Sequence, residues 1–235
     1  MSMDIVSSIV SNAKRDGRLK LLEHEAYEVL RAYDLPVPKA SLAKDPDEAV
    51  DFAERVGYPV VLKVVSPDIS HKSDVGGVML NLRGSNEVRK AFNDIQRNVS
   101  RLAPKARIYG ILVQEMVPNG LEVIVGSTRD PSFGPLILFG LGGIFVEVLR
   151  DVSFRIAPLT YYDVESMINE IKAAKILEGY RGQAPRDKKA LIEIIMKVSK
   201  LVEDVAEIKD VDLNPIMLYE IGKGAKIADA RIILG

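Results

Sequence analysis

The chain has 235 residues, and its 32 Lys and Arg residues nearly balance its 33 Asp and Glu residues, giving a formal net charge of −1. This balance disfavours nucleic acid as the main partner, because binding to a phosphate backbone needs a surplus of basic residues. Cysteine is absent, which excludes disulfides, iron–sulfur clusters and thiolate zinc sites. Only His24 and His71 carry imidazoles, so any metal is expected to be a hard cation with oxygen ligands.

No apolar stretch reaches the roughly 18 residues that a membrane-spanning helix requires. The N-terminus, Met-Ser-Met-Asp-Ile-Val, lacks the basic and apolar regions of a signal peptide. The sequence therefore predicts a cytoplasmic protein with no membrane partner.

The first part of the chain mixes helix and strand patterns. Apolar residues recur at helical spacing in the first two segments, and Asp45, Pro46 and Gly57 suit the N-cap, first-turn and C-terminal positions of a third helix. In chain order the expected elements are helices over 3–14, 21–33 and 45–56, strands over 58–65 and 76–82, a helix over 87–102 and a strand over 108–117.

After Pro118-Asn-Gly120 the pattern changes to a run of short strands, so we place a boundary between two lobes there. The expected elements are strands over 121–127, 135–139, 144–149 and 152–156, helices over 163–177 and 187–206, and a closing hairpin of strands 208–219 and 225–234. This mixture predicts an α+β fold (α/β mixed) and not a regular βαβ repeat.

Lys63 interrupts the otherwise apolar strand around Val60–Val65, and the chain contains neither a P-loop nor a dinucleotide-binding glycine motif. Either Lys63 faces solvent from a half-exposed strand, or its ammonium group is aimed at phosphate. The following loop favours phosphate, because Ser70-His-Lys-Ser73 offers hydroxyls and a second cation, Lys72. Gly76 and Gly77 also allow the backbone to approach a ligand closely.

A weaker signal lies where the strand before Pro118 ends. The segment Gln114-Glu-Met-Val117 can present exposed backbone N–H and C=O groups to an adenine edge, and Glu122 can bond a ribose hydroxyl. The alternative is that Glu115 and Glu122 are ordinary solvent-facing strand residues.

Three oxygen-bearing side chains near the C-terminus suggest a metal site. Asp212 and Asn214 alternate with apolar residues, so they project from one face of a strand, and Asp229 lies in an apolar run of the pairing strand. Together they can hold Mg²⁺ against phosphate oxygens. The alternative is an exposed polar face without a ligand.

Five short motifs follow one another in a specific order: Val-Val-Leu-Lys63, Gly76-Gly-Val, Val-Gln-Glu-Met116, Phe-Gly-Leu-Gly-Gly143 and Asp-Leu-Asn-Pro215. In this order they resemble an ATP-grasp domain, and in particular the β subunit of ADP-forming acyl-CoA (acetyl-CoA) synthetases, relatives of succinyl-CoA synthetase. The similarity covers residues 22–234. It implies two lobes with the nucleotide bound between them: a helical segment 1–21 that packs on the C-terminal lobe, an N-terminal lobe 22–117 and a C-terminal lobe 118–235.

The resemblance also implies a role for each candidate residue. The nucleotide would be ADP or ATP with Mg²⁺, and its phosphates would be contacted by Lys63 and by Lys72 or the glycine loop. The implied residues are Lys63, Lys72, Gly76 and Gly77 for phosphate, Gln114, Glu115, Met116 and Val117 for adenine, Glu122 for ribose, and Asn214 and Asp229 for Mg²⁺ with Asp212 close by.

His71 matches the loop-borne histidine of this family, which is proposed to carry phosphate transiently towards the nucleotide. Chemically, an imidazole near neutral pH is a good phosphoryl acceptor. The alternative is an ordinary surface histidine. We interpret His24, in Glu23-His-Glu-Ala, as structural.

The chain contains neither a CoA-binding region nor the histidine that is phosphorylated at the acyl-phosphate site in larger family members. The resemblance therefore implies a separate α subunit that supplies both, in a probable α2β2 heterotetramer. The implied reaction is acyl-CoA + ADP + Pi = carboxylic acid + ATP + CoA, with the acyl group and CoA mainly on the partner. Two alternatives stay open: a stand-alone ATP-grasp ligase that joins a carboxylate to an amine, and a nucleotide-binding regulatory subunit without catalysis.

Overall fold

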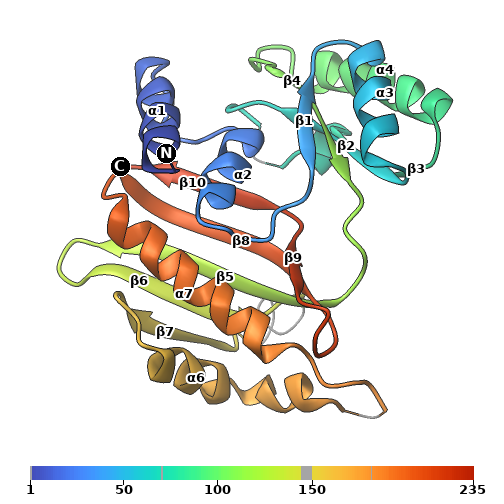
Figure 1. Cartoon of the computed structure of the whole chain (residues 1–235). Helices are drawn as coiled ribbons and strands as arrows, with labels where there is room; N and C mark the ends of the chain where they lie inside the picture. The colour runs from blue at the N-terminus through green and yellow to red at the C-terminus, as the bar shows by residue number, and fades with distance from the viewer. Residues whose placement is uncertain (1, 70, 144–149, 181) are drawn as a thin grey trace. The chain divides into compact units, whose positions relative to one another are not determined.

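The computed structural model of the chain describes residues 2–69, 71–143, 150–180 and 182–235 (Figure 1). These residues form two compact units. Unit 1 lies within Met1–Leu21, Ala26–Val37 and Val117–Gly235, and unit 2 consists of Leu22–Glu25 and Pro38–Met116. Among the described residues, no helix is long and apolar enough to cross a membrane.

The predicted lobe 22–117 differs from this division at its end, where Val117 belongs to unit 1, and in one internal stretch, residues 26–37, which also belong to unit 1. Two hydrogen bonds hold this stretch there: Tyr27 Oη donates to the carbonyl of Ala228 at 3.2 Å, and the N–H of Ile227 donates to the carbonyl of Pro36 at 2.9 Å. Helix α2 (Glu23–Ala32) therefore contributes its first turn to unit 2 and its remainder to unit 1.

Unit 2 is a four-stranded antiparallel sheet covered on one face by two helices. The strand order is β1 (Ala40–Ala43), β4 (Gly110–Glu115), β2 (Val60–Val65) and β3 (Val78–Leu82). Helices α3 (Pro46–Val56) and α4 (Ser85–Leu102) pack on this sheet and on each other (Figure 1). Their apolar faces meet alternate strand residues in one core, as Phe92 and Leu62 illustrate.

The elements predicted for unit 2 are present, but strand β1 was not predicted. Its four residues, Ala-Ser-Leu-Ala, show no alternation of apolar and polar side chains. The strand forms because it pairs with β4, with Ala40 opposite Gln114. Helix α3 begins as predicted, since the Asp45 carboxylate accepts the N–H groups of Asp47 and Glu48 at 2.9 Å each.

Unit 1 contains a six-stranded antiparallel sheet. Its strands are β5 (Leu121–Asp130), β6 (Gly134–Leu141), β7 (Val152–Ile156), β8 (Ile208–Leu218), β9 (Ala225–Ile227) and β10 (Ala230–Leu234), in the order β10-β8-β5-β6-β7 with β9 also on β8. Helix α7 (Lys188–Asp204) packs on β5, β6 and β8, and α6 (Tyr161–Glu170) packs on β6 and β7 (Figure 1). Helix α1 (Ser2–Arg15) precedes a segment that pairs with β10.

Two predictions for unit 1 need correction. The helix predicted over 163–177 ends at Glu170, and a 3-10 helix, η2 (Lys172–Glu178), follows because the buried Asp151 carboxylate accepts the N–H groups of Lys172 and Ala173 at 2.8 Å each. The predicted strand 225–234 is split into β9 and β10. The strand predicted over 144–149 lies outside the described residues.

The loop after β2 is fixed to unit 2 by a bidentate ion pair. Arg107 donates to the Asp68 carboxylate from Nε at 3.0 Å, from Nη2 at 2.8 Å and from its backbone N–H at 2.8 Å. These hydrogen bonds from the Arg107 side chain and backbone, together with the positive charge, lower the pKa of Asp68 to about 2.

This ion pair makes the stability of the loop pH-dependent. Because the pKa of Asp68 is lower in the folded state, its contribution is complete above the unfolded pKa of roughly 4 and is lost as the pH falls towards 2. We expect Asp68→Asn to be less stable than the parent chain near neutral pH, with the difference shrinking at acidic pH. Urea titrations of both proteins between pH 7 and pH 3 measure this difference, and a constant difference would contradict the role given to the Asp68 charge.

Candidate functional site

Lys63 projects from the face of the unit 2 sheet opposite the helices. All six residues of β2 are buried, and Val60, Leu62 and Val64 join the core beneath α3 and α4. Because side chains alternate across a strand, Lys63 points to the other face. Only 8% of its surface is exposed, so the interpretation of Lys63 as a solvent-facing residue is wrong.

One carboxylate, that of Glu23, bonds both this buried lysine and a second one. Lys63 Nζ donates to Glu23 Oε1 at 2.6 Å, and Lys72 Nζ donates to Glu23 Oε2. The Glu23 side chain is 3% exposed, against 10% for Lys63 and 20% for Lys72. The three ionised groups together carry one net positive charge, which suits an anionic ligand.

Glu23 was not predicted as a site residue. The available signal was indirect: a lysine inside an apolar strand needs a counter-charge if it is buried. The sequence offers many carboxylates, and only the fold shows that Glu23, 40 positions away, is the partner.

The segment from His71 to Gly77 is held by backbone hydrogen bonds within unit 2. Gly77 donates to the carbonyl of Lys72 at 2.8 Å, and Val64 donates to the carbonyl of Gly77 at 2.8 Å. A short 3-10 helix, η1 (Ser73–Val75), lies between them. The predicted loop residue Ser70 lies outside the described residues, whereas His71 is described and its side chain is exposed. His24 lies half-buried in the first turn of α2.

Gly77 is required here because a side chain has no room. A Cβ at this position would lie 2.5 Å from Val64 Cγ1 and 2.9 Å from the carbonyl oxygen of Lys72. Gly76 has a left-handed conformation with a φ of 61°. The two glycines therefore allow the backbone of Lys72 to pack closely against β2. The sequence predicted instead that they let the backbone approach a ligand.

We expect Gly77→Ala to displace the Lys72 backbone, to lower the free energy of unfolding by about 1–3 kcal/mol and to weaken nucleotide binding. The matched control is Gly84→Ala, since a Cβ at Gly84 would have no neighbour within 4 Å. That control removes only a favourable N-cap residue and is expected to cost about 1 kcal/mol or less without changing nucleotide affinity. Chemical denaturation and calorimetric titration with Mg-ADP measure both effects, and equal losses of affinity in the two variants would contradict this role of Gly77.

The predicted adenine segment has its N–H groups engaged within unit 2. Glu115 donates its N–H to the carbonyl of Lys39 at 3.0 Å, and Met116 donates to the carbonyl of Pro59 at 3.1 Å. These two N–H groups are therefore used within unit 2. They are occupied because β4 is an interior strand between β1 and β2. Gln114 is buried on the same strand, and Val117 belongs to unit 1.

In unit 1, Glu122 lies exposed near the start of β5, against the glycine-rich motif. Gly142 donates its N–H to the carbonyl of Glu122 at 2.8 Å, and a Cβ at Gly142 would lie 2.8 Å from Glu122 Cβ. A Cβ at Gly143 would be 3.9 Å from Glu122 Oε2. The glycines of Phe-Gly-Leu-Gly-Gly143 thus permit close packing against the residue predicted to bind ribose.

Two of the three predicted metal ligands, Asp212 and Asn214, lie on one face of β8, and both line the same cavity. Asp212 pairs with Arg231 and Leu213 pairs with Ala230, and Ala228 donates its N–H to the carbonyl of Pro215 at 2.9 Å. Asp229, which directly precedes β10, therefore lies at the chain position next to Asn214 across the strand pair.

This donor set fits Mg²⁺ in chemistry, because it consists of carboxylate and amide oxygens. The described residues contain no cluster of three or more His, Cys, Asp or Glu side chains with metal-binding geometry. Asp212 is bonded to Arg231, whose Nη2 lies 3.0 Å from Asp212 Oδ2. Asp212 therefore balances the charge of Arg231, a residue that was not predicted to belong to this region, and Asn214 and Asp229 remain as candidate ligands.

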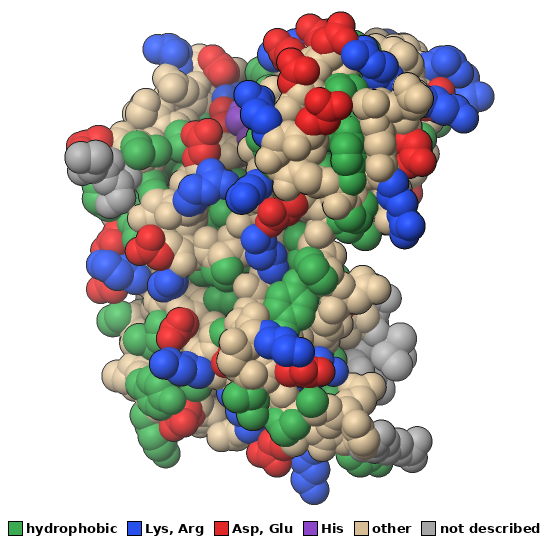
Figure 2. Space-filling model, turned by 45° about the vertical axis from the view of Figure 1, so that its right-hand side comes forward, with side chains coloured by type: hydrophobic (Ala, Val, Ile, Leu, Met, Phe, Trp, Pro, Cys, Tyr) green, Lys and Arg blue, Asp and Glu red, His purple; other side chains and the backbone are tan. Residues whose placement is uncertain are grey.

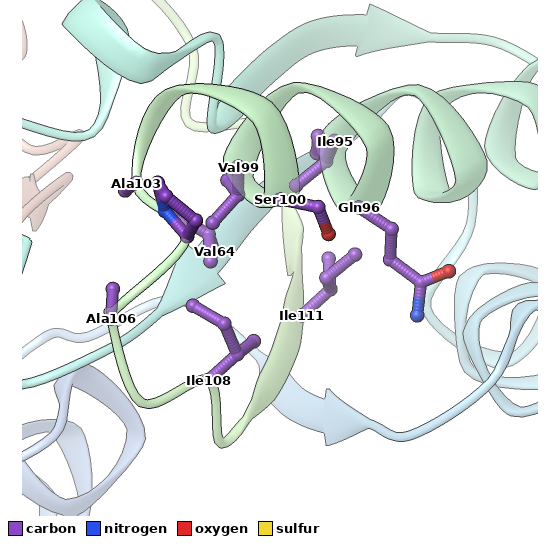
Figure 3. Close-up of a pocket in the computed structure, with 10 residues that line it drawn as sticks. Val64, Ile95, Gln96, Val99, Ser100, Ala103, Ala106, Ile108 and Ile111 are labelled. Atoms are coloured by element: carbon purple, nitrogen blue, oxygen red, sulfur yellow. The ribbon is translucent and has the colours of Figure 1, made fainter.

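The described residues line several cavities within the units, among them one in unit 1 and one in unit 2. One of about 390 Å³ opens on the face of the unit 1 sheet that carries Asp212 and Asn214, and its apolar wall includes Leu138 and Phe154. The other, of about 350 Å³, lies in unit 2 beneath the end of α4, and its lining includes Ile95 and Ser100 (Figure 3). None of the predicted site residues lines the second cavity.

The face drawn in Figure 2 carries Lys and Arg side chains interspersed with Asp and Glu, in keeping with the balanced net charge.

Comparison with known proteins identifies the class to which this fold and these residues belong. Residues 12–234 match the family model described as an ATP-grasp domain, so the chain belongs to the ATP-grasp family. Within it, the chain is 50% identical over 227 residues to the acetate–CoA ligase [ADP-forming] II subunit beta of Pyrococcus furiosus, covering 96% of each protein. It therefore belongs with the β subunits of ADP-forming acetate–CoA ligases, which confirms the family inferred from the sequence.

Two further relatives agree with this assignment. The acetate–CoA ligase [ADP-forming] I of Archaeoglobus fulgidus is 53% identical over 211 residues, which are 90% of this chain but 30% of that protein. The structure also matches the dinucleotide forming acetyl-coenzyme A synthetase 1 of Ca. Korarchaeum cryptofilum. In its complex with coenzyme A and Ca-AMPCP the TM-score is 0.93 at 52% identity, covering 97% of this chain and 99% of that one. In its complex with coenzyme A and Mg-AMPPCP, with the phosphohistidine segment pointing towards the nucleotide binding site, the TM-score is 0.87 at 47% identity, covering 98% and 100%.

Proposed function

We propose that this chain is the nucleotide-binding β subunit of an ADP-forming acetyl-CoA or acyl-CoA synthetase. The observation that carries the proposal is the 50% identity to the Pyrococcus furiosus β subunit over 96% of both proteins. The reaction is acyl-CoA + ADP + Pi = carboxylic acid + ATP + CoA. The buried cluster of Lys63, Lys72 and Glu23 supports the assignment, because it supplies a net positive charge for phosphate.

This chain performs the last step of that reaction. The phosphorylated histidine of the partner subunit donates its phosphoryl group, so that its N–P bond breaks as an N–P bond to a ring nitrogen of His71 forms. The N–P bond on His71 then breaks as a terminal phosphate oxygen of ADP forms the new O–P bond. Lys63 and Lys72 stabilise the negative charge of the group in transfer, and the protein contributes mainly by positioning and electrostatics. The exposed position of His71 beside Lys72 supports this role.

Each unit contributes residues with a proposed role in nucleotide binding. In unit 2, Gln114, Glu115 and Met116 contact adenine, and in unit 1 Val117 continues this segment and Glu122 bonds the ribose. In unit 1, Asn214 and Asp229 hold Mg²⁺, which neutralises phosphate charge when it is bound. The neighbouring chain positions of these two residues, Asn214 on β8 and Asp229 directly before β10, support the assignment.

A partner α subunit supplies CoA binding and the first phosphorylated histidine, and we propose an α2β2 assembly. Two comparisons support a partner: the Pyrococcus furiosus relative is named a subunit, and the Archaeoglobus fulgidus relative contains the matching region as 30% of a longer chain.

The phosphoryl transfer predicts a covalent intermediate on His71. We expect the chain incubated with Mg²⁺ and γ-labelled ATP to acquire acid-labile, base-stable label, and we expect His71→Ala to lose it. The matched control is His24→Gln, the other histidine of the chain, which should retain the label. Equal labelling of His71→Ala and the parent would exclude the carrier role, and ATP turnover by the chain alone would favour a stand-alone ligase.

The metal assignment predicts a change in Mg²⁺ dependence. We expect Asp229→Ala to raise the Mg²⁺ concentration for half-maximal ADP binding by about tenfold or more, since a carboxylate ligand is lost. Asp210→Ala is the control, because Asp210 lies on β8, the strand that carries Asn214, and accepts a hydrogen bond from Thr128 Oγ1 at 2.7 Å. Titration of Mg²⁺ at constant ADP measures this shift, and an equal response of both variants would argue against Asp229 as a ligand.

A further inference from the structure

The ion-pair cluster of Glu23, Lys63 and Lys72 connects strand β2 to the segment that carries His71. Lys63 belongs to strand β2, whereas Lys72 directly follows the exposed His71. The two ammonium groups bond to different oxygens of the same Glu23 carboxylate. Glu23 thereby ties the His71–Lys72 segment to the strand that carries the other phosphate-binding lysine.

Electrostatics explains why a carboxylate is needed between the Lys63 and Lys72 ammonium groups. Two ammonium groups in a buried space repel each other, and the repulsion is stronger there than in water because the effective dielectric constant is lower. A carboxylate between them removes this repulsion before any nucleotide arrives. It uses only part of their hydrogen-bonding capacity, since each ammonium group has three N–H donors.

We propose that Glu23 is a positioning residue for phosphoryl transfer: its carboxylate holds the Lys63 and Lys72 ammonium groups side by side and so orients the His71 segment. This inference rests on the proposed function of the two lysines and of His71. Glu23 acts through the lysines and does not touch the reacting phosphate. Protein kinases use a comparable lysine–glutamate ion pair for the same purpose.

The test uses the chain assembled with its partner subunit, with ATP formation from acetyl-CoA, ADP and phosphate as the measurement. Glu23→Gln keeps the size of the side chain and removes the charge. We expect it to lower kcat by about tenfold or more while the KM for ADP changes by less than about threefold, because the tie acts in the transfer step. Glu28→Gln, an exposed glutamate on the same helix, is expected to leave both constants unchanged.

A double-mutant cycle shows whether Glu23 acts through Lys72. If it does, Glu23→Gln combined with Lys72→Met loses no more kcat than the more damaging single variant. Losses that multiply, or a Glu23→Gln kcat above half of the parent value, would overturn the inference.

Glu23→Asp serves where Glu23→Gln folds poorly, because it keeps the charge but shortens the reach to two ammonium groups. A retained thermal midpoint with a reduced kcat supports positioning, and a parental kcat overturns it. A purely structural role would lower the midpoint and leave kcat per folded molecule unchanged. An inactive parent complex would defeat the proposed function itself, whereas an active parent with an unaffected Glu23→Gln would defeat this inference alone.

Discussion

A lysine in the middle of a buried strand is stable as a cation only if an opposite charge is buried with it, and this requirement organises unit 2. Glu23 meets it for Lys63 and at the same time for Lys72. Lys72 belongs to the segment that backbone hydrogen bonds through Gly77 hold against β2. The Glu23 carboxylate therefore connects the first turn of α2, strand β2 and the segment that carries His71. The excess of one positive charge explains why the cluster is suited to phosphate.

In unit 1, charged side chains are balanced on one face of the sheet. The antiparallel pair of β8 and β10 places polar side chains on one face of the sheet, while alternate residues such as Val211 and Leu213 are buried. Asp212 is balanced by Arg231. The neighbouring amide and carboxylate of Asn214 and Asp229 offer the hard oxygen ligands that a divalent cation prefers. The same alternation that buries Val211 and Leu213 thus places both the charge-balancing Asp212 and the candidate ligand Asn214 on the opposite face.

The sequence predicted those parts of the fold and site that depend on local patterns. Alternation along β8 correctly placed Asp212 and Asn214 on one face, and the Asp45-Pro46 start of α3 was predicted from its cap. Strand β1 was missed because pairing with β4 stabilises a segment without a pattern of its own. Glu23 and Arg231 were missed for the same reason: their partners are distant in sequence, and only the folded chain brings them together. Asp151 likewise ended a helix from 21 residues away.

The chain is held in place on both sides of His71. Asp68 is clamped by Arg107, and the Lys72 backbone is bonded to Gly77. The main chain around His71 is thus tied to α4's following loop through Asp68 and Arg107, and to β2 through the hydrogen bonds of Lys72, Gly77 and Val64. A carrier role for His71 would have to operate from this anchored segment.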